Sequence, residues 1–337
     1  MQNDFVLGER KSMTLPGAIV DLPSITDKDE VDLVEFGMKN GVDIVAASFI
    51  RKGEDIDNVR TLLGEPGKSV KIFAKVENRE ALSNYDEIVA AADGVIICRV
   101  ALAQEIPAEK MFIAQKYMIE KANLASKPCI ILGNLISSMV TEDTPRRSES
   151  QDIAIAVLDG VDCLMVNEET ASGEHSLATV QMLSKICAEA ERCMDYKKTL
   201  AYTNQFTKRP SPLEALASNA AAQVLDSQID LIIVHTETGH MAQVMAKYKP
   251  SVPILAVSSC TQPWERVVSQ LGVSRGITAY KIGSFADFDQ LCVLSIAQAK
   301  ALGLCKQGRK VIFIHGDVTG EFPEPPDVDP RLKLIDV

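Results

Sequence analysis

Five short apolar runs recur through the first two hundred residues, each separated from the next by an amphipathic segment. Each run is almost continuously apolar, which is typical of a strand that is covered on both faces. The segments between them have helical spacing, and one begins at Thr26, where T-D-K-D resembles a capping box. This alternation predicts a parallel sheet, either curled toward a barrel or open and doubly wound. The runs are VDIVAASF (42–49), KIFAKV (71–76), GVIIC (94–98), PCIILG (128–133) and DCLMV (162–166).

A second set of strand and helix patterns follows a polar stretch at residues 196–212, which lacks periodicity and which we expect to be a linker. The alternation of strands and helices beyond it predicts a three-layer α/β domain. The expected division is therefore a first domain over 1–195, the linker over 196–212 and a second domain over 213–337. The strand-like runs of the second domain are DLIIVH (230–235), PILAVSS (253–259), GITAYKIG (276–283), KVIFIHG (310–316) and RLKLIDV (331–337).

Charge and cysteine usage narrow the class of protein. A net charge of −11 over 337 residues argues against nucleic acid or an anionic membrane as a partner. The eight cysteines form no C-x-x-C pair, and no apolar run is long enough to span a membrane. The first residues, MQNDFVLGER, lack the apolar stretch of a secretory signal. We therefore expect a cytoplasmic protein.

The chemistry centres on KVEN, at the end of the second apolar run. Lys75 and Glu77 are two residues apart, so on a strand both side chains point to the same side. An ammonium there can offset the charge of a transferring phosphoryl group, and a carboxylate can hold Mg²⁺. From position alone, an ordinary salt bridge at the rim of the sheet explains the pair as well.

The order of several motifs resembles the pyruvate kinase family, most closely its plant cytosolic branch. The motifs are ERKSMTLPG, VDLPSIT, ASFIRK, KVEN, EIP and ETASGEHS. The resemblance implies phosphoryl transfer from phosphoenolpyruvate to ADP, giving pyruvate and ATP, with Lys75 catalytic, Glu77 a ligand of Mg²⁺, and K⁺ as a further cofactor. It also implies a (β/α)₈ barrel, of which the chain would hold about five βα units and no lid domain.

The resemblance further implies that Ser48, Arg51, Asn78 and Arg99 surround the substrate. Ser48 would also lie near the monovalent cation, although a polar residue closing a strand end is the plainer explanation. A loop over 235–243, HTETGHMAQ, resembles the effector-phosphate loop of regulated members. A helix cap explains that loop better, because His240 and Met241 replace its hydroxyl or basic residues.

Three positions depart from the family pattern. Ala101 stands where A-R-G-D-L-G supplies the second metal carboxylate, and Val100 replaces the glycine whose backbone approaches the substrate. Gly133 replaces a threonine that is implicated in protonating the enolpyruvate. All three changes affect the same chemistry.

These departures favour a catalytically impaired paralogue that acts as a binding or assembly subunit, in a homo- or hetero-oligomer with pyruvate kinase subunits. The helical segment 212–227 matches one that makes a subunit contact in the family. An active pyruvate kinase, alone or completed by another subunit, is the alternative, and a truncated product without function is a third possibility.

Overall fold

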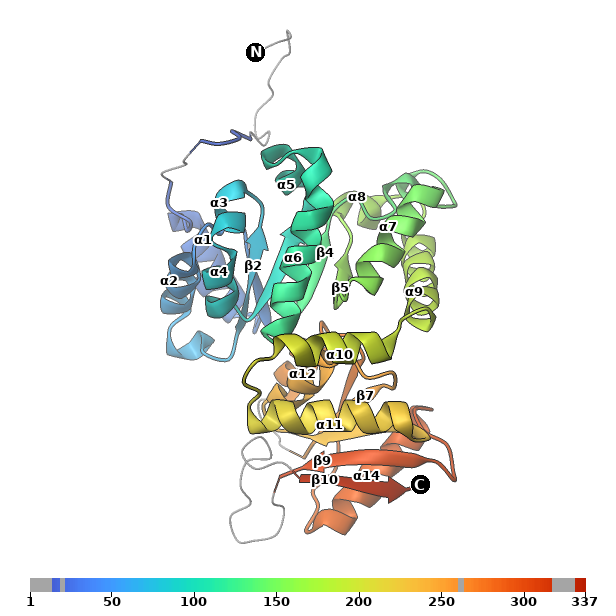
Figure 1. Ribbon diagram of the computed structural model, residues 1–337. Coiled ribbons are helices and arrows are strands. Elements are labelled where there is room, and N and C mark those ends of the chain that lie inside the picture. The colour runs from blue at the N-terminus through green and yellow to red at the C-terminus, as the bar shows by residue number, and fades with distance from the viewer. Residues whose placement is uncertain (1–13, 19–21, 260–263, 317–330) are drawn as a thin grey trace.

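The computed structural model describes residues 14–18, 22–259, 264–316 and 331–337. Most of the ERKSMTLPG motif, residues 9–13, lies outside these ranges. Two α/β units follow one another along the chain, each built around a five-stranded sheet. They are stacked end to end, with the first unit above the second in Figure 1.

The first sheet contains the five predicted strands in sequence order, β1-β2-β3-β4-β5, and every neighbouring pair is parallel. This confirms the predicted set of βα units. Among the described residues, β1 and β5 each pair on one side alone. The strands are β1 (Ile44–Ala47), β2 (Lys71–Val76), β3 (Gly94–Cys98), β4 (Cys129–Leu132) and β5 (Cys163–Met165).

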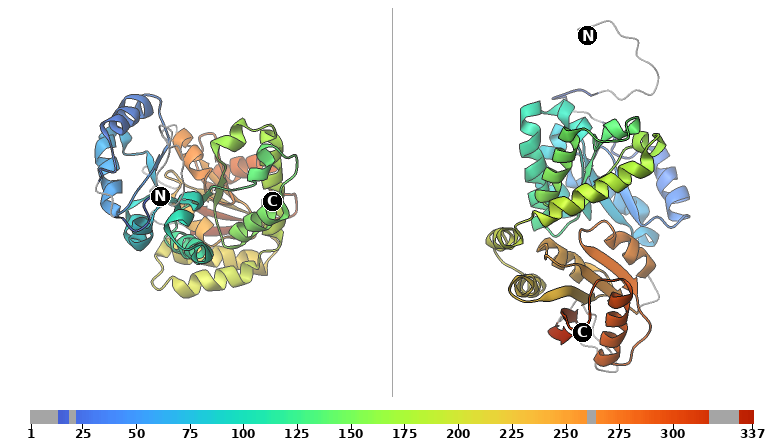
Figure 2. Two further views of the ribbon diagram at one scale, coloured as in Figure 1. Left: turned by 90° about the horizontal axis from the view of Figure 1, so that it is seen from above. Right: turned by 90° about the vertical axis from the view of Figure 1, so that its right-hand side faces the viewer.

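Helices lie in an arc along the outer side of these strands (Figure 2). The Thr26 capping box is present, because the Thr26 hydroxyl accepts a hydrogen bond from the Asp29 N–H while the Asp29 carboxylate accepts one from the Thr26 N–H. The elements are α1 (Asp27–Val31), the π-helix η1 (Asp32–Met38), α2 (Gly53–Leu63), η2 (Glu65–Gly67), α3 (Arg79–Ser83), α4 (Tyr85–Ala91), α5 (Arg99–Glu105), η3 (Ala108–Lys110), α6 (Met111–Leu124), η4 (Ser137–Val140), α7 (Arg147–Leu158), α8 (Glu168–Ser172) and α9 (Ser176–Arg192).

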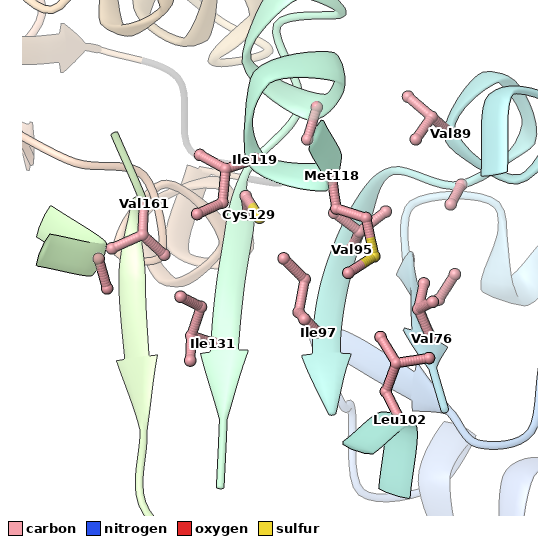
Figure 3. Close-up of a cluster of buried hydrophobic side chains, with 14 of the residues drawn as sticks. Val76, Val89, Val95, Ile97, Leu102, Met118, Ile119, Cys129, Ile131 and Val161 are labelled. Atoms are coloured by element: carbon pink, nitrogen blue, oxygen red, sulfur yellow. The ribbon is translucent and has the colours of Figure 1, made fainter. Parts of the chain in front are cut away.

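The first core lies between this sheet and its helices. Alternate residues of β2, β3 and β4 point toward α6, where Met118 and Ile119 are completely buried (Figure 3). The opposite face of the sheet buries a smaller cluster around Phe73, Ile96 and Ile130. Apolar residues on both faces explain why the strand sequences are continuously apolar.

Residues 196–212 differ from the irregular linker that the sequence suggested, because α10 (Tyr196–Phe206) occupies most of the segment. Asp195 caps this helix by accepting a hydrogen bond from the Lys198 N–H at 3.0 Å. Leu200 is 8% exposed and belongs to the core of the second unit. Tertiary packing therefore stabilises a helix whose own sequence is largely polar.

The second unit has the strand order β10-β9-β6-β7-β8, in which only β10 is antiparallel to its neighbour. Separate apolar cores cover its two faces, which confirms the predicted three-layer arrangement. The elements are α11 (Pro212–Asp226), β6 (Ile229–His235), α12 (His240–Lys247), β7 (Ile254–Ser258), α13 (Trp264–Leu271), β8 (Ile277–Lys281), α14 (Phe288–Ala301), β9 (Lys310–His315) and β10 (Arg331–Asp336).

Polar contacts join the two units at the amino ends of the first sheet. The Gln270 amide of α13 donates to the carbonyls of Asp43 and Ser69, which precede β1 and β2. Arg275 donates to Glu191 at 2.9 Å. Because the amino ends of the first sheet face the second unit, its carboxyl ends point away from that unit. No described helix has both the length and the apolar composition needed to cross a membrane.

Candidate active site

The carboxyl ends of β1 and β2 bring Ser48, Lys75 and Glu77 together. The Lys75 Nζ lies 3.0 Å from Glu77 Oε1, as the spacing of two residues predicted, and donates to Ser48 Oγ at 2.8 Å. The Lys75 side chain is 21% exposed and that of Glu77 is 8% exposed. The ammonium and the carboxylate thus neutralise one another in a largely dehydrated place, where their attraction exceeds that of a surface pair.

Phe49 is a member of this group that no sequence signal indicated. Its backbone N–H donates to Glu77 Oε2 at 2.9 Å, so both oxygens of the carboxylate have partners. The N–H reaches that position with a φ of +54°, which is unusual for a residue other than glycine. Backbone in this region carries strain of about 1–3 kcal/mol and is concentrated at functional sites.

Glu77 is the carboxylate of this group that could serve as a ligand of Mg²⁺. Mg²⁺ requires oxygen ligands in near-octahedral geometry, and each Glu77 oxygen has one protein partner, which leaves a lone pair on each oxygen. Ala101 offers a methyl group, and burial, followed by the nearby Glu77 charge, raises the pKa of the Cys98 thiol, so that it stays protonated. Over the described part of the chain, no three His, Cys, Asp or Glu residues are grouped closely enough to hold a metal.

Arg99 begins α5, directly after β3, and its guanidinium is fully engaged. Its Nε and Nη2 donate to the Gly133 carbonyl at 3.2 and 2.9 Å, and its Nη1 lies 2.6 Å from Asp152 Oδ2 on α7. These contacts join the ends of β3 and β4 to α7. In this position Arg99 acts as a structural clamp, because its guanidinium is bonded to protein groups on both sides and is not a free cation at the mouth of the site.

The other residues expected near the substrate also have local partners. The Asn78 side chain caps α3 by accepting a hydrogen bond from the Ala81 N–H at 2.8 Å. Arg51 donates through Nη2 to the Leu22 carbonyl at 2.5 Å. The Ser48 hydroxyl accepts a hydrogen bond from the Lys75 ammonium, so a monovalent cation at this hydroxyl would lie beside a positive charge.

The three positions that depart from the family pattern lie at the ends of β3 and β4. Val100 and Ala101 occupy the first turn of α5, and Gly133 directly follows β4. Val100 is 40% exposed, whereas Gly133 is buried. The loop after β4 is irregular, because Gly133, Asn134 and Ile136 all have positive φ.

In the second unit, the 235–243 loop leads into α12 through Gly239, the N-cap residue, and no side chain caps the helix with a hydrogen bond. The Thr236 hydroxyl accepts a hydrogen bond from the Gly239 N–H at 3.0 Å, and the Thr238 hydroxyl accepts one from the His240 N–H at 3.2 Å. Gly239, with a φ of +82°, turns the chain into α12. These bonds stabilise the turn before the helix and do not amount to the side-chain cap that the sequence suggested.

Comparison with known proteins agrees with the fold and with the motifs of this site. A sequence model of the pyruvate kinase barrel domain matches residues 1–180, and one of the pyruvate kinase α/β domain matches residues 214–322. The chain belongs to the pyruvate kinase family.

Individual relatives give the same picture over most of the chain. It is 41% identical to a pyruvate kinase of Eimeria tenella over 94% of this chain and 59% of the relative. It is 39% identical to the cytosolic pyruvate kinase isozyme of Nicotiana tabacum over 93% of this chain and 65% of that protein. A crystal structure of a pyruvate kinase from Cryptosporidium parvum superposes with a TM-score of 0.88 and 35% identity, over 96% of this chain and 64% of that one. The chain thus spans about three fifths of the length of these relatives.

Proposed function

We propose that this chain is a pyruvate kinase family protein whose phosphoryl-transfer site is impaired and which acts as a binding or assembly subunit. The family's reaction moves the phosphoryl group of phosphoenolpyruvate to ADP. Mg²⁺ neutralises charge in such a transfer, and a positioned ammonium stabilises the group in flight. In this chain Lys75 would supply the ammonium, while the metal would lack its second carboxylate.

The observation that carries the proposal is the state of Glu77. Its Oε1 pairs with Lys75, its Oε2 accepts the Phe49 N–H, and Ala101 stands where a second carboxylate would be needed. A cation entering here would lie beside the Lys75 ammonium and would find in Glu77, which is 8% exposed, a single carboxylate ligand. Like charges held this close repel one another, so one carboxylate would hold the metal weakly.

The enolate protonation step is impaired as well. Gly133 has no hydroxyl, and the Arg99 guanidinium beside it is bonded to the Gly133 carbonyl and to Asp152. The described residues at this end of β4 therefore offer no obvious acid for an enolpyruvate carbon. Active-site groups that act as a unit lose activity non-additively, so two defects of this kind leave little turnover.

Retention of Lys75 and Ser48 supports the alternative, an enzyme with residual activity. A coupled assay distinguishes the impaired subunit from an enzyme with residual activity. It measures the pyruvate that purified protein forms from phosphoenolpyruvate and ADP with Mg²⁺ and K⁺. Lys75→Met is the control for contaminating host enzyme. We expect the same rate for both proteins; a rate that disappears in Lys75→Met would establish the active enzyme instead.

We assign the assembly role to α11, which would contact another pyruvate kinase subunit. One side of this helix packs into the second core, while Ala215, Asn219 and Gln223 form an exposed stripe at helical spacing. Sedimentation of the chain, alone and mixed with a full-length pyruvate kinase, tests this assignment. Asn219→Arg should weaken the association. Asn58→Arg, the same change on the exposed face of α2, should not.

This assembly role would be wrong if the chain sediments as a monomer under both conditions, or if the two arginine variants behave alike. Relatives named as cytosolic isozymes, such as those of Nicotiana tabacum and Solanum tuberosum, support a cytoplasmic location for the subunit. Phosphoenolpyruvate and ADP remain the substrates to be tested in the activity assay.

A further inference from the structure

Two of the substituted positions touch one another. A Cβ built on Gly133 would lie 2.8 Å from Val100 Cγ2, closer than carbon atoms in real structures approach. The same Cβ would be 3.6 Å from the Val100 backbone nitrogen. Any residue larger than glycine at 133 therefore meets the Val100 side chain at once.

The two segments are held side by side, because Cys98 of β3 pairs with Leu132 of β4 directly before them. Arg99, the residue before Val100, also donates to the Gly133 carbonyl with Nε at 3.2 Å and Nη2 at 2.9 Å. These contacts oppose a separation of the start of α5 from the end of β4. The valine side chain is stiff as well, because a β-branched residue in a helix strongly prefers one χ1 rotamer.

We infer that Val100 and Gly133 are an interlocked pair, in which Val100 fills the space that a side chain at 133 would need. This inference rests on the proposed function, since it explains why the site stays closed. Regaining a hydroxyl at 133 by a single substitution would therefore lower stability, because its Cβ would meet the Val100 side chain. The impaired state is thus maintained by packing, and not only by missing ligands.

Backbone conformation adds a second cost that must be separated from the steric one. Gly133 has a φ of +101°, which any other residue adopts with strain. Gly308 supplies a matched reference, because its φ is +78° and nothing lies within 4 Å of the Cβ position. Gly308→Ala therefore introduces the backbone strain without a steric clash.

The test is a double-substitution cycle read by thermal unfolding. The first cycle contains Val100→Ala, Gly133→Ala and the double variant of these two. The reference cycle contains Val100→Ala, Gly308→Ala and the double variant of these two. For backbone strain alone, we expect Gly308→Ala to lower Tm by about 3 °C in either background. Gly133→Ala should lower Tm by about 8 °C with Val100 present, and by about 3 °C in the Val100→Ala background.

Equal losses for Gly133→Ala in the two backgrounds would overturn the interlock. A Gly133→Ala protein that folds only when it also carries Val100→Ala would support it, and failure to fold in both backgrounds would contradict it. The cycle measures stability and not turnover. A pyruvate kinase rate in the wild-type chain would therefore refute the proposed function while leaving the interlock to be judged separately.

Discussion

Removing the Arg99 guanidinium distinguishes a structural clamp from a substrate-binding cation. Arg99→Met would strip the Gly133 carbonyl of both its N–H donors and would remove the pair with Asp152. A buried acceptor left without a donor costs about 1–3 kcal/mol. The Asp152 side chain is 42% exposed, so its pairing adds at most about 1 kcal/mol.

We therefore expect Arg99→Met to lower the free energy of unfolding by about 1–4 kcal/mol, and Asp152→Asn to lower it by no more than about 1 kcal/mol. Urea unfolding followed by circular dichroism measures both. Arg192→Met is the matched control, because Arg192 forms an exposed pair with Glu189 and should change little. An Arg99→Met protein as stable as Arg192→Met would refute the clamp, and it would return Arg99 to the group of candidate substrate ligands.

Three further predictions concern other parts of the first unit. Lys127→Met should lower the free energy of unfolding by about 2 kcal/mol in the same urea assay, because the Lys127 ammonium donates to three carbonyls at the end of α4, at 2.5, 2.8 and 2.6 Å. Iodoacetamide at pH 8 should label the exposed Cys193 well before Cys98, because burial raises the pKa of the Cys98 thiol. Peptide mass spectrometry measures the labelling of each cysteine. Comparable labelling of both in the folded protein would contradict this prediction. Hydrogen bonds from Thr26 lower the pKa of the Asp29 carboxyl group. The contribution of this group to stability is therefore present at neutral pH and is lost as pH falls through the acidic range. Thr26→Ala should make the stability of the protein depend less on pH in an acid titration.

The sequence predicted the strands well because their physical signal is local. GVIIC is apolar throughout and KIFAKV is apolar apart from its two lysines, since both faces of the parallel sheet are buried. The Thr26 cap was also found from four consecutive residues. Helix α10 was missed, because its stability comes from Leu200 packing into a core whose other members lie far along the chain.

The candidate site also contains some features that the sequence predicts and others that it does not. Convergence of Lys75 and Glu77 follows from strand geometry and was predictable from their spacing. The bond from the Phe49 N–H depends on a left-handed backbone that no sequence motif announces. The contact between Val100 and Gly133 joins residues 33 positions apart in the chain, so it becomes visible only when the ends of β3 and β4 are seen side by side.

The central claim, that this site no longer holds a divalent metal, is tested most directly by titrating the purified protein with Mn²⁺ as a probe of the Mg²⁺ position. Free Mn²⁺ would be followed by electron paramagnetic resonance, with Glu77→Gln as the control for binding elsewhere. We expect wild type and Glu77→Gln to bind Mn²⁺ equally weakly, because Glu77 lies beside the Lys75 ammonium and Ala101 offers no second carboxylate. Stoichiometric binding at micromolar Mn²⁺ that is lost in Glu77→Gln would contradict the account, because Glu77 would then exchange Lys75 for a metal.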